Sequence, residues 1–227
     1  MNENYLYILI DLETTGLDVK TNRICSIGAC VYDNEELNNN NFQTNFDETT
    51  RFISNEYEFY SYVNPLQINY AYHINNISDE ILRESSTFPT VIHLFWNWLL
   101  TLKIKYETKE IVFIGHNIDN FDELMLLSEI RRSKISLPDI NFYKIDTMKI
   151  FKYLFPITLK SIPYSLTCLV HCPDSYKQSD IYKFLYNHEP NNQHNALGDV
   201  RTLLKILKCN AIKNIIFMCE PENSKLY

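Results

Sequence analysis

Glycine is scarce in this chain, and long apolar stretches are missing. Only four of the 227 residues are glycine. No stretch approaches the roughly 20 consecutive apolar residues that a membrane-spanning helix needs, and the apolar segment of residues 5–10 is too short for the core of a signal peptide. These absences predict a soluble intracellular protein, in the cytoplasm or the nucleus, without a membrane partner.

An excess of positive charge and a cysteine framework are also lacking. The formal net charge of −7 at pH 7 excludes a broad basic surface that coats nucleic acid without specificity. It does not exclude a nuclease, because a bound metal ion supplies local positive charge that a count of side chains misses. The six cysteines follow neither a disulfide pattern nor the paired spacing of a zinc site, which predicts reduced thiols.

What the sequence does contain is an alternation of short apolar runs and helical patterns. We expect strands at residues 5–12, 24–32, 58–63, 111–114 and 215–218. We expect helices after an N-cap at Ser78 and at residues 88–102, 120–132, 147–153, 165–170 and 195–207. The first two strands are joined by a short polar segment and should therefore pair antiparallel. This order predicts an α/β fold with a mixed sheet flanked by helices.

Two polar segments interrupt the pattern. Residues 34–56 are rich in Asn, Glu and Thr, which predicts a long surface loop or insertion. Residues 173–190 are polar and rich in tyrosine, and no element is assigned to them. Either segment would contact a partner or only elaborate the surface. Because no linker or internal repeat divides the chain, residues 1–227 are expected to form a single domain.

The first segment that suggests chemistry runs from Asp11 to Gly16. Side chains alternate along a strand, so Asp11 and Glu13 should share one face. Two carboxylates at the end of an apolar strand are costly unless they are paired or bind a metal ion. Taken alone, the pair is better explained by a strand end that faces water.

A second segment, residues 115–122, joins the strand at 111–114 to a helix. Asp122 should lie in the first turn of that helix and face the crevice at the strand ends. A simple helix cap explains this segment equally well when it is taken alone, with Asn117 among the capping candidates.

The third segment places His194 five residues before Asp199. Five residues of α-helix rotate by about 500°, so the two side chains would not share a face of one helix. We therefore expect His194 on the loop before the helix and Asp199 on the helix itself. The alternative is a surface histidine beside an ordinary N-terminal aspartate.

The three segments taken together favour a metal site. They contain three of the four glycines in the chain, namely Gly16, Gly115 and Gly198. Each segment offers an acid at the edge of a sheet, and one adds a histidine, which ordinarily titrates near neutral pH. Ligands that are all oxygen suit Mg²⁺ or Mn²⁺ better than zinc.

From about Tyr5 to Leu207, these motifs resemble the DEDDh 3′–5′ exonuclease family of the ribonuclease H-like superfamily, nearest the proofreading epsilon subunit of DNA polymerase III. The resemblance implies a ribonuclease H-like mixed sheet flanked by helices. It implies that Asp11, Glu13, Asp122 and Asp199 are catalytic carboxylates that hold two divalent cations, Mg²⁺ or Mn²⁺. It also implies that His194 is the general base that takes a proton from the attacking water.

The same resemblance suggests which residues contact the substrate. The expected substrate-binding residues are Glu13, Thr14, Thr15, Gly16, Leu17, His73, Asn117 and His194. The chain departs from the family around His73, because Ile74 stands where the family usually has glycine and Ile68 where epsilon-type proteins have an acid.

The implied activity is release of nucleoside monophosphates from DNA 3′ ends, with single-stranded DNA favoured over RNA. A polymerase partner is expected by analogy with epsilon-type proteins, although no segment marks a polymerase-binding tail. Two alternatives stay open: an RNA exonuclease similar to RNase T or oligoribonuclease, and an inactive nucleic-acid-binding or scaffolding module. A third, the phosphate loop of an actin-like kinase, is excluded because the chain is too short for two such lobes.

Overall fold

A computed structural model of the protein describes residues 5–32, 51–108, 110–155, 172–191, 194–212 and 215–226. Its strands are β1 (Tyr5–Thr14), β2 (Ile24–Val31), β3 (Phe52–Ser54), β4 (Glu58–Tyr62), β5 (Glu110–Gly115), β6 (Asn141–Asp146) and β7 (Glu222–Asn223). They form one sheet of seven strands in the order β3-β4-β2-β1-β5-β6-β7. The predicted mixed sheet is confirmed, since β1 pairs antiparallel with β2 and parallel with β5.

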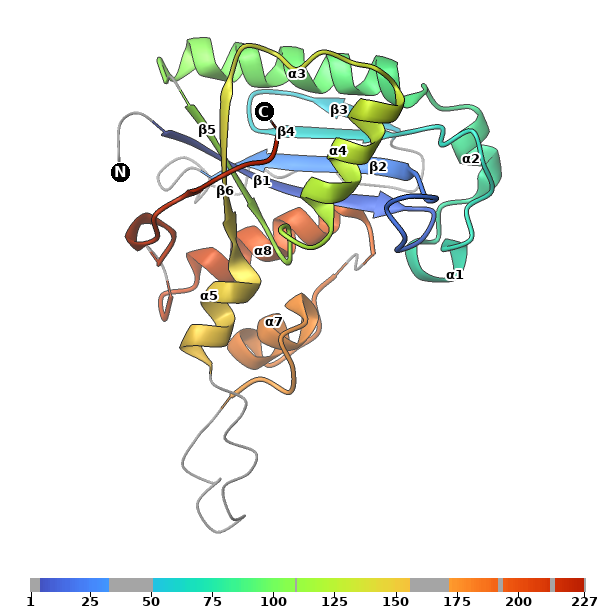
Figure 1. Ribbon diagram of the computed structural model, residues 1–227. Helices are drawn as coiled ribbons and strands as arrows, with labels where there is room; N and C mark the ends of the chain where they lie inside the picture. Colours follow the sequence, from blue (N-terminus) through green and yellow to red (C-terminus); the bar gives the residue numbers. More distant parts are fainter. Residues whose placement is uncertain are drawn as a thin grey trace.

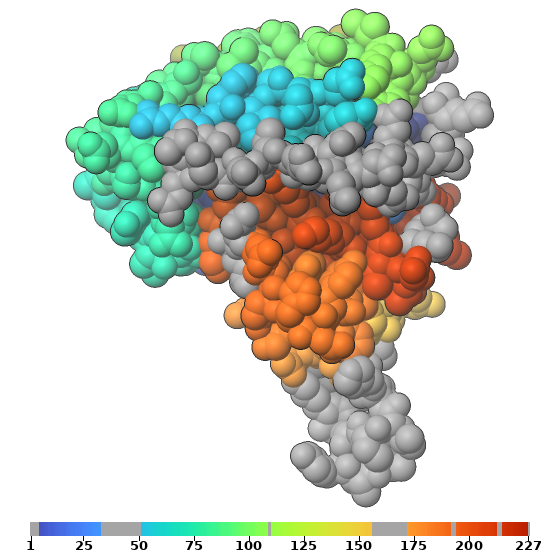
Figure 2. Space-filling model, turned by 180° about the vertical axis from the view of Figure 1, so that it is seen from behind, coloured from blue at the N-terminus to red at the C-terminus, as the bar shows by residue number. Residues whose placement is uncertain are grey.

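Helices cover both faces of the sheet (Figure 1). They are α1 (Tyr72–Asn75), α2 (Asp79–Arg83), α3 (Phe88–Lys105), α4 (Asp122–Arg132), α5 (Thr147–Leu154), α7 (Gln178–Tyr186) and α8 (Ala196–Lys208). Helices α3 and α4 bury one apolar core against the sheet, and α5, α7 and α8 bury a second on the other face. Seen from behind, α3 and β3 form the upper part of the molecule and α7 and α8 the lower part (Figure 2).

The arrangement of parallel strands determines where a site can form. Strands β1, β5 and β6 run parallel to one another in the middle of the sheet, so their carboxyl ends meet at one edge. The residues that follow β5 and β6, and the N-terminus of α8, converge near the end of β1. Ligands of open α/β sheets bind at such an edge.

Some predicted elements differ from the structure. Residues Ile215–Met218 form a short 3₁₀ helix rather than a strand, so that prediction was wrong. A four-residue apolar run cannot distinguish a strand from a helical turn by its pattern alone. Strand β3 lies inside the segment expected as a loop and pairs with β4. The predicted helix at 165–170, and residues 34–50, lie outside the described residues.

The predicted N-cap at Ser78 is confirmed. Ser78 caps α2 by accepting a hydrogen bond from the backbone N–H of Ile81. The five cysteines of the described part of the chain are free thiols. None of the described helices combines the length and the apolarity that crossing a bilayer would require.

Candidate active site

Three carboxylates meet at the end of β1. Each of Asp11, Glu13 and Asp199 offers an oxygen atom, and these atoms all lie within 4.8 Å of one another. Strand β1 presents the first two on one face, as the alternation of side chains predicted, and α8 brings the third from the far end of the chain. All three residues are half-buried. This set is called the acid cluster below.

The fourth predicted acid, Asp122, lies directly beside this cluster. It is the first residue of α4 and is only 5% exposed. Its Oδ1 atom accepts a hydrogen bond from the backbone N–H of Leu12, which stands between Asp11 and Glu13, at 3.1 Å. All four acids inferred from separate segments therefore gather around the end of one strand.

The pKa values of these acids are raised far above those of carboxylates exposed to water. Burial raises the pKa of Asp11 well above its ordinary range, and the neighbouring charges of Asp122, Asp199 and Glu13 raise it further. Burial and the charges of Asp199 and Asp122 raise the pKa of Glu13 to about 8. Burial also raises the pKa of Asp122 to about 7 and that of Asp199 to about 7, against the opposing effect of backbone hydrogen bonds. Such clustered, destabilised carboxylates are a mark of functional sites.

Helix α8 brings Asp199 to the acid cluster because Gly28 of β2 allows the backbone of the helix to pack closely against the strand. A Cβ atom on Gly28 would lie 2.4 Å from the carbonyl carbon of Ala196 and 2.5 Å from the backbone nitrogen of Leu197. One turn further on, Arg201 forms a two-pronged ion pair with buried Glu58, with distances of 2.6 and 2.7 Å. Gly28 was the one glycine without a role in the sequence analysis. Its role depends on which helix packs against β2, and the local sequence does not indicate that helix.

His194 lies just before α8, as predicted. Asn195 caps the helix, accepting from the backbone N–H of Gly198, and its own amide donates to the hydroxyl of Tyr60. The backbone of His194 has a φ of 61°, an uncommon value for a side-chain-bearing residue. Its N–H donates to Oδ2 of Asp199 at 3.0 Å, and the residue is exposed. The backbone of this loop thus orients Asp199, while the imidazole of His194 stays exposed beside the acid cluster.

A cleft of about 320 Å³ opens beside the acid cluster. Asp11, Asp199, Asn117 and His194 line it, and the residues at the start of α7 close it on another side. Lys177 is the one Lys or Arg among the cleft-lining residues that the structure describes. The sequence analysis missed Lys177, because it lies in the polar segment to which no element was assigned.

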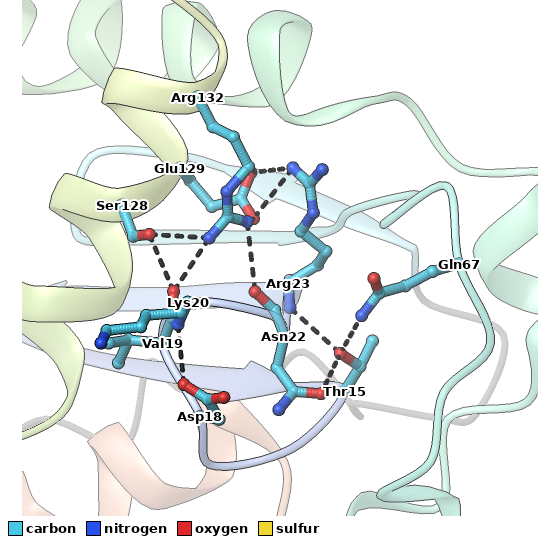
Figure 3. A network of polar contacts seen from close by, with 10 residues as sticks. All are labelled: Thr15, Asp18, Val19, Lys20, Asn22, Arg23, Gln67, Ser128, Glu129 and Arg132. Carbon is cyan, nitrogen blue, oxygen red and sulfur yellow. Dashed lines mark hydrogen bonds and ion pairs between the residues drawn. The ribbon is translucent and has the colours of Figure 1, made fainter.

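The turn that follows β1 is held by internal bonds. The Thr14 hydroxyl donates to the carbonyl of Gly16. The Thr15 hydroxyl, fully buried, accepts from the side chain of Gln67 and from the backbone N–H of Arg23 (Figure 3). Thr14 and Thr15 stay predicted substrate residues, with their hydroxyl groups already committed to the turn.

Helix α4 anchors the same turn. Glu129 pairs with Arg23 at 3.3 Å and with Arg132 at 2.6 Å (Figure 3). Arg132 in turn donates to the backbone carbonyls of Val19 and Asn22. Because α4 also carries Asp122, one helix fixes both an acid and the turn beside the cluster.

The remaining predicted substrate residues lie on the rims of the cleft or of the turn. Gly16 follows the cluster, and a Cβ there would lie 2.8 Å from the side chain of Asn22. Leu17 is 79% exposed. Asn117 has a φ of 68°, and its backbone N–H donates to Asp146. His73 is exposed on α1.

A second histidine near the cleft is differently placed. The ring of His116 lies between the hydroxyl of Thr147 and the carbonyl of Tyr176, at 3.1 and 2.7 Å. Burial lowers its pKa. Because a carbonyl oxygen can only accept, the His116 Nε2–H donates to Tyr176 and supports the wall of the cleft.

Comparison with known proteins gives one family and several similar structures. A family model described as Exonuclease (RNase_T) matches residues 8–207. A search of curated protein sequences gives no match. Similar solved structures include the zinc-bound complex of E. coli exonuclease I with single-stranded DNA, with a TM-score of 0.64, 14% identity and 95% of this chain covered.

Two further structures have similar scores. Exonuclease I of E. coli with a dT13 oligonucleotide has a TM-score of 0.62, 16% identity and 94% of this chain covered. A 3′-exonuclease that recognises the stem-loop of histone mRNA has a TM-score of 0.60, 16% identity and 91% of this chain covered. The chain spans 42% of the exonuclease I chains and 65% of the histone mRNA exonuclease. At these identities, the likeness establishes the ribonuclease H-like exonuclease fold.

Proposed function

This chain belongs to the exonuclease family whose model spans residues 8–207, and from that premise we propose that it is a metal-dependent 3′–5′ exonuclease. The substrate is the 3′ end of single-stranded DNA, and the products are nucleoside monophosphates. The observation that carries the proposal is the meeting of Asp11, Glu13 and Asp199, with ligand oxygens within 4.8 Å, beside an open cleft.

The donor set fits a hard divalent cation. The acids offer only carboxylate oxygens, which Mg²⁺ and Mn²⁺ prefer. Their raised pKa values follow from burial and mutual repulsion, and a cation among them would relieve both. Asp11, Glu13, Asp122 and Asp199 would hold two such ions, which when bound supply the positive charge that stabilises the attacking and leaving oxygens of phosphodiester hydrolysis.

Three other residues would bind the substrate or accept a proton. His194, which is exposed and whose backbone N–H donates to Asp199, would take a proton from the attacking water. Lys177, which also lines the cleft, would supply a positive charge for a phosphate group. Leu17, at the exposed turn after β1, is placed to pack on the terminal base.

The second candidate is an RNA 3′–5′ exonuclease with the same site, since one similar structure is a complex with single-stranded DNA and another recognises an RNA. The deciding experiment compares digestion of single-stranded DNA, RNA and dinucleotides labelled near the 5′ end, with Mg²⁺ or Mn²⁺. We expect stepwise shortening from the 3′ end, fastest for DNA. Faster digestion of RNA would favour the alternative, and no digestion of any polymer would overturn the proposal.

A polymerase partner is part of the same proposal, because epsilon-type proteins serve polymerases. Co-sedimentation with a purified replicative polymerase from the same source tests it. Independent sedimentation at micromolar concentrations would contradict it.

A further inference from the structure

Between β4 and α2 the chain reverses the usual distribution of polar and apolar residues. Five apolar or aromatic residues are exposed, among them Leu66 at 77% and Tyr70 at 70%; we call the five the α1 platform, and they are Leu66, Ile68, Tyr70, Tyr72 and Ile74. Two polar residues of the same stretch, Asn69 and Asn75, are each only 5% exposed. Five exposed large apolar side chains within nine residues are a concentration of the kind that marks an interaction site.

The platform is held in place from beneath by those two buried amides. Asn69 donates to the side chain of Asn75 at 2.9 Å and to the carbonyl of Ile77 at 2.7 Å, and its N–H donates to Asp79 at 2.8 Å. Asn75 accepts from the backbone N–H of Ile77. Because the buried hydrogen bonds fix the backbone, the exposure of the apolar side chains is a property of the folded state.

The platform is continuous with the acid cluster. The amide of Asn75 donates to the backbone carbonyl of Thr14, the residue after Glu13, at 3.1 Å. Gln67, within the platform segment, donates to the hydroxyl of Thr15 (Figure 3). In Figure 1, α1 lies just beyond the end of β1. A polymer that ends at the acid cluster would therefore reach the platform within a short distance.

The charge of this surface indicates which part of the polymer it recognises. Residues 64–82 contain no Lys or Arg, and they include Asp79 and Glu80. Such a surface does not attract phosphate groups. The faces of nucleic-acid bases, in contrast, stack on aromatic and apolar side chains regardless of sequence.

We infer that the α1 platform stacks the unpaired bases just upstream of a 3′ end whose last phosphodiester lies at the acid cluster. This inference rests on the proposed function and adds a physical reason why the end must be unpaired. It also explains how a chain of net charge −7 holds nucleic acid: stacking replaces much of the phosphate neutralisation on which basic proteins depend. The affinity should accordingly depend only weakly on salt concentration.

The test uses the double variant Tyr70→Ala/Tyr72→Ala and, as a matched control, Tyr153→Ala, which removes an 86% exposed tyrosine from α5. Two substrates are compared: a 12-nucleotide oligothymidylate (a length of ~12 lets the strand cover the platform), and the p-nitrophenyl ester of thymidine 5′-monophosphate, which is too short to reach it. The double variant should raise KM for the oligonucleotide by ~10-fold to 100-fold with kcat unchanged. The ester, and the control variant with either substrate, should behave as in the wild type.

An oligonucleotide without bases at the second and third positions from its 3′ end sharpens the result. The wild type should lose as much affinity for it as the double variant has lost for the complete oligonucleotide, and the double variant should not distinguish the two. An unchanged oligonucleotide KM in a correctly folded double variant overturns the platform but leaves the exonuclease intact. A wild-type protein inactive on both substrates contradicts the proposed function itself. A wild-type dimer that becomes a monomer in the double variant would identify the surface as a contact between copies, and would also overturn the inference.

Discussion

The acid cluster and the α1 platform are adjacent. They depart in opposite ways from the usual rule that charged side chains are exposed and apolar side chains are buried. The cluster places carboxylates where burial raises their pKa. The platform places apolar and aromatic side chains in water while burying the two amides beneath them. Each arrangement costs stability in the free protein. Each is therefore best explained by what binds there, a cation in one case and the faces of bases in the other.

The two regions also differ in how they are built. The acids of the cluster come from β1 and α8, and Asp122 beside them comes from α4, so the cluster exists only when elements from both ends of the chain have packed together. The platform is local, since one stretch between β4 and α2 provides both its exposed residues and the buried bonds that hold them. Because of this difference, mutations should be able to impair catalysis and substrate binding separately. Each prediction below tests that separation.

The largest effect is expected for Asp199→Ala. Removing one carboxylate of the cluster should abolish cleavage, because the donor set for the divalent cations is incomplete. The protein should still fold, since the change removes a repelling charge, and it should still bind oligonucleotide through the platform. Cleavage is measured with 5′-labelled single-stranded DNA, and binding by fluorescence anisotropy. Full activity with Mg²⁺ or Mn²⁺ would remove Asp199 from the site.

A smaller loss is expected for His194→Ala. Without the proposed general base, the enzyme should lose at least ~10² in kcat, while KM for oligonucleotide changes little. A normal rate would mean that another group takes the proton.

Gly28→Ala tests whether the cluster depends on distant packing. The added methyl would press against the backbone of Ala196 and Leu197, so α8 must move and carry Asp199 away from Asp11. We expect overpacking that costs ~1–3 kcal/mol of folding free energy and a fall in kcat of ~10-fold or more. Thermal melts and steady-state kinetics measure both, and circular dichroism checks that the fold persists. Platform binding should survive, and equal loss of binding and catalysis would refute the separation.

The smallest effect concerns pH and stability without metal. In the folded state the pKa of Glu13 is raised to about 8 and that of Asp199 to about 7, so the folded protein holds protons that the unfolded chain releases near pH 4. Stability must therefore fall as pH rises from about 4 to about 8. In EDTA we expect Tm to drop by ~several degrees across this window, less in Asp199→Asn.

Mn²⁺ provides the complementary arm of this experiment. The ion should raise Tm and flatten its pH dependence in the wild type, and Asp11→Ala should lose that stabilisation. The platform variant Tyr70→Ala/Tyr72→Ala should keep it. Equal stabilisation of the wild type and Asp11→Ala would show that Mn²⁺ binds elsewhere.

Much of the cluster could be predicted from the sequence, because its signals are local. The alternation in β1 places Asp11 and Glu13 on one face, and helical rotation separates His194 from Asp199. The parts that escaped prediction depend on distant contacts. Gly28 matters only because α8 packs on it, and the sequence of β2 does not predict that contact.

Strand β6 and the α1 platform were missed for related reasons. Lys144 interrupts the apolar pattern of β6, yet it is buried because Asp119 and Glu123 pair with it at 2.7 and 2.8 Å. On the platform the apolar residues point outward, so any rule that buries apolar side chains predicts the wrong face. Tertiary ion pairs and bound ligands lie beyond what periodicity records.

The central claim is that the carboxylates around the end of β1 hold divalent cations. Crystals soaked in Mn²⁺ and measured at the manganese absorption edge test it most directly. The account predicts an anomalous peak within coordination distance of Asp11, with Glu13 and Asp199 as further ligands. A fully occupied peak elsewhere on the molecule, and none between these three residues, would contradict it.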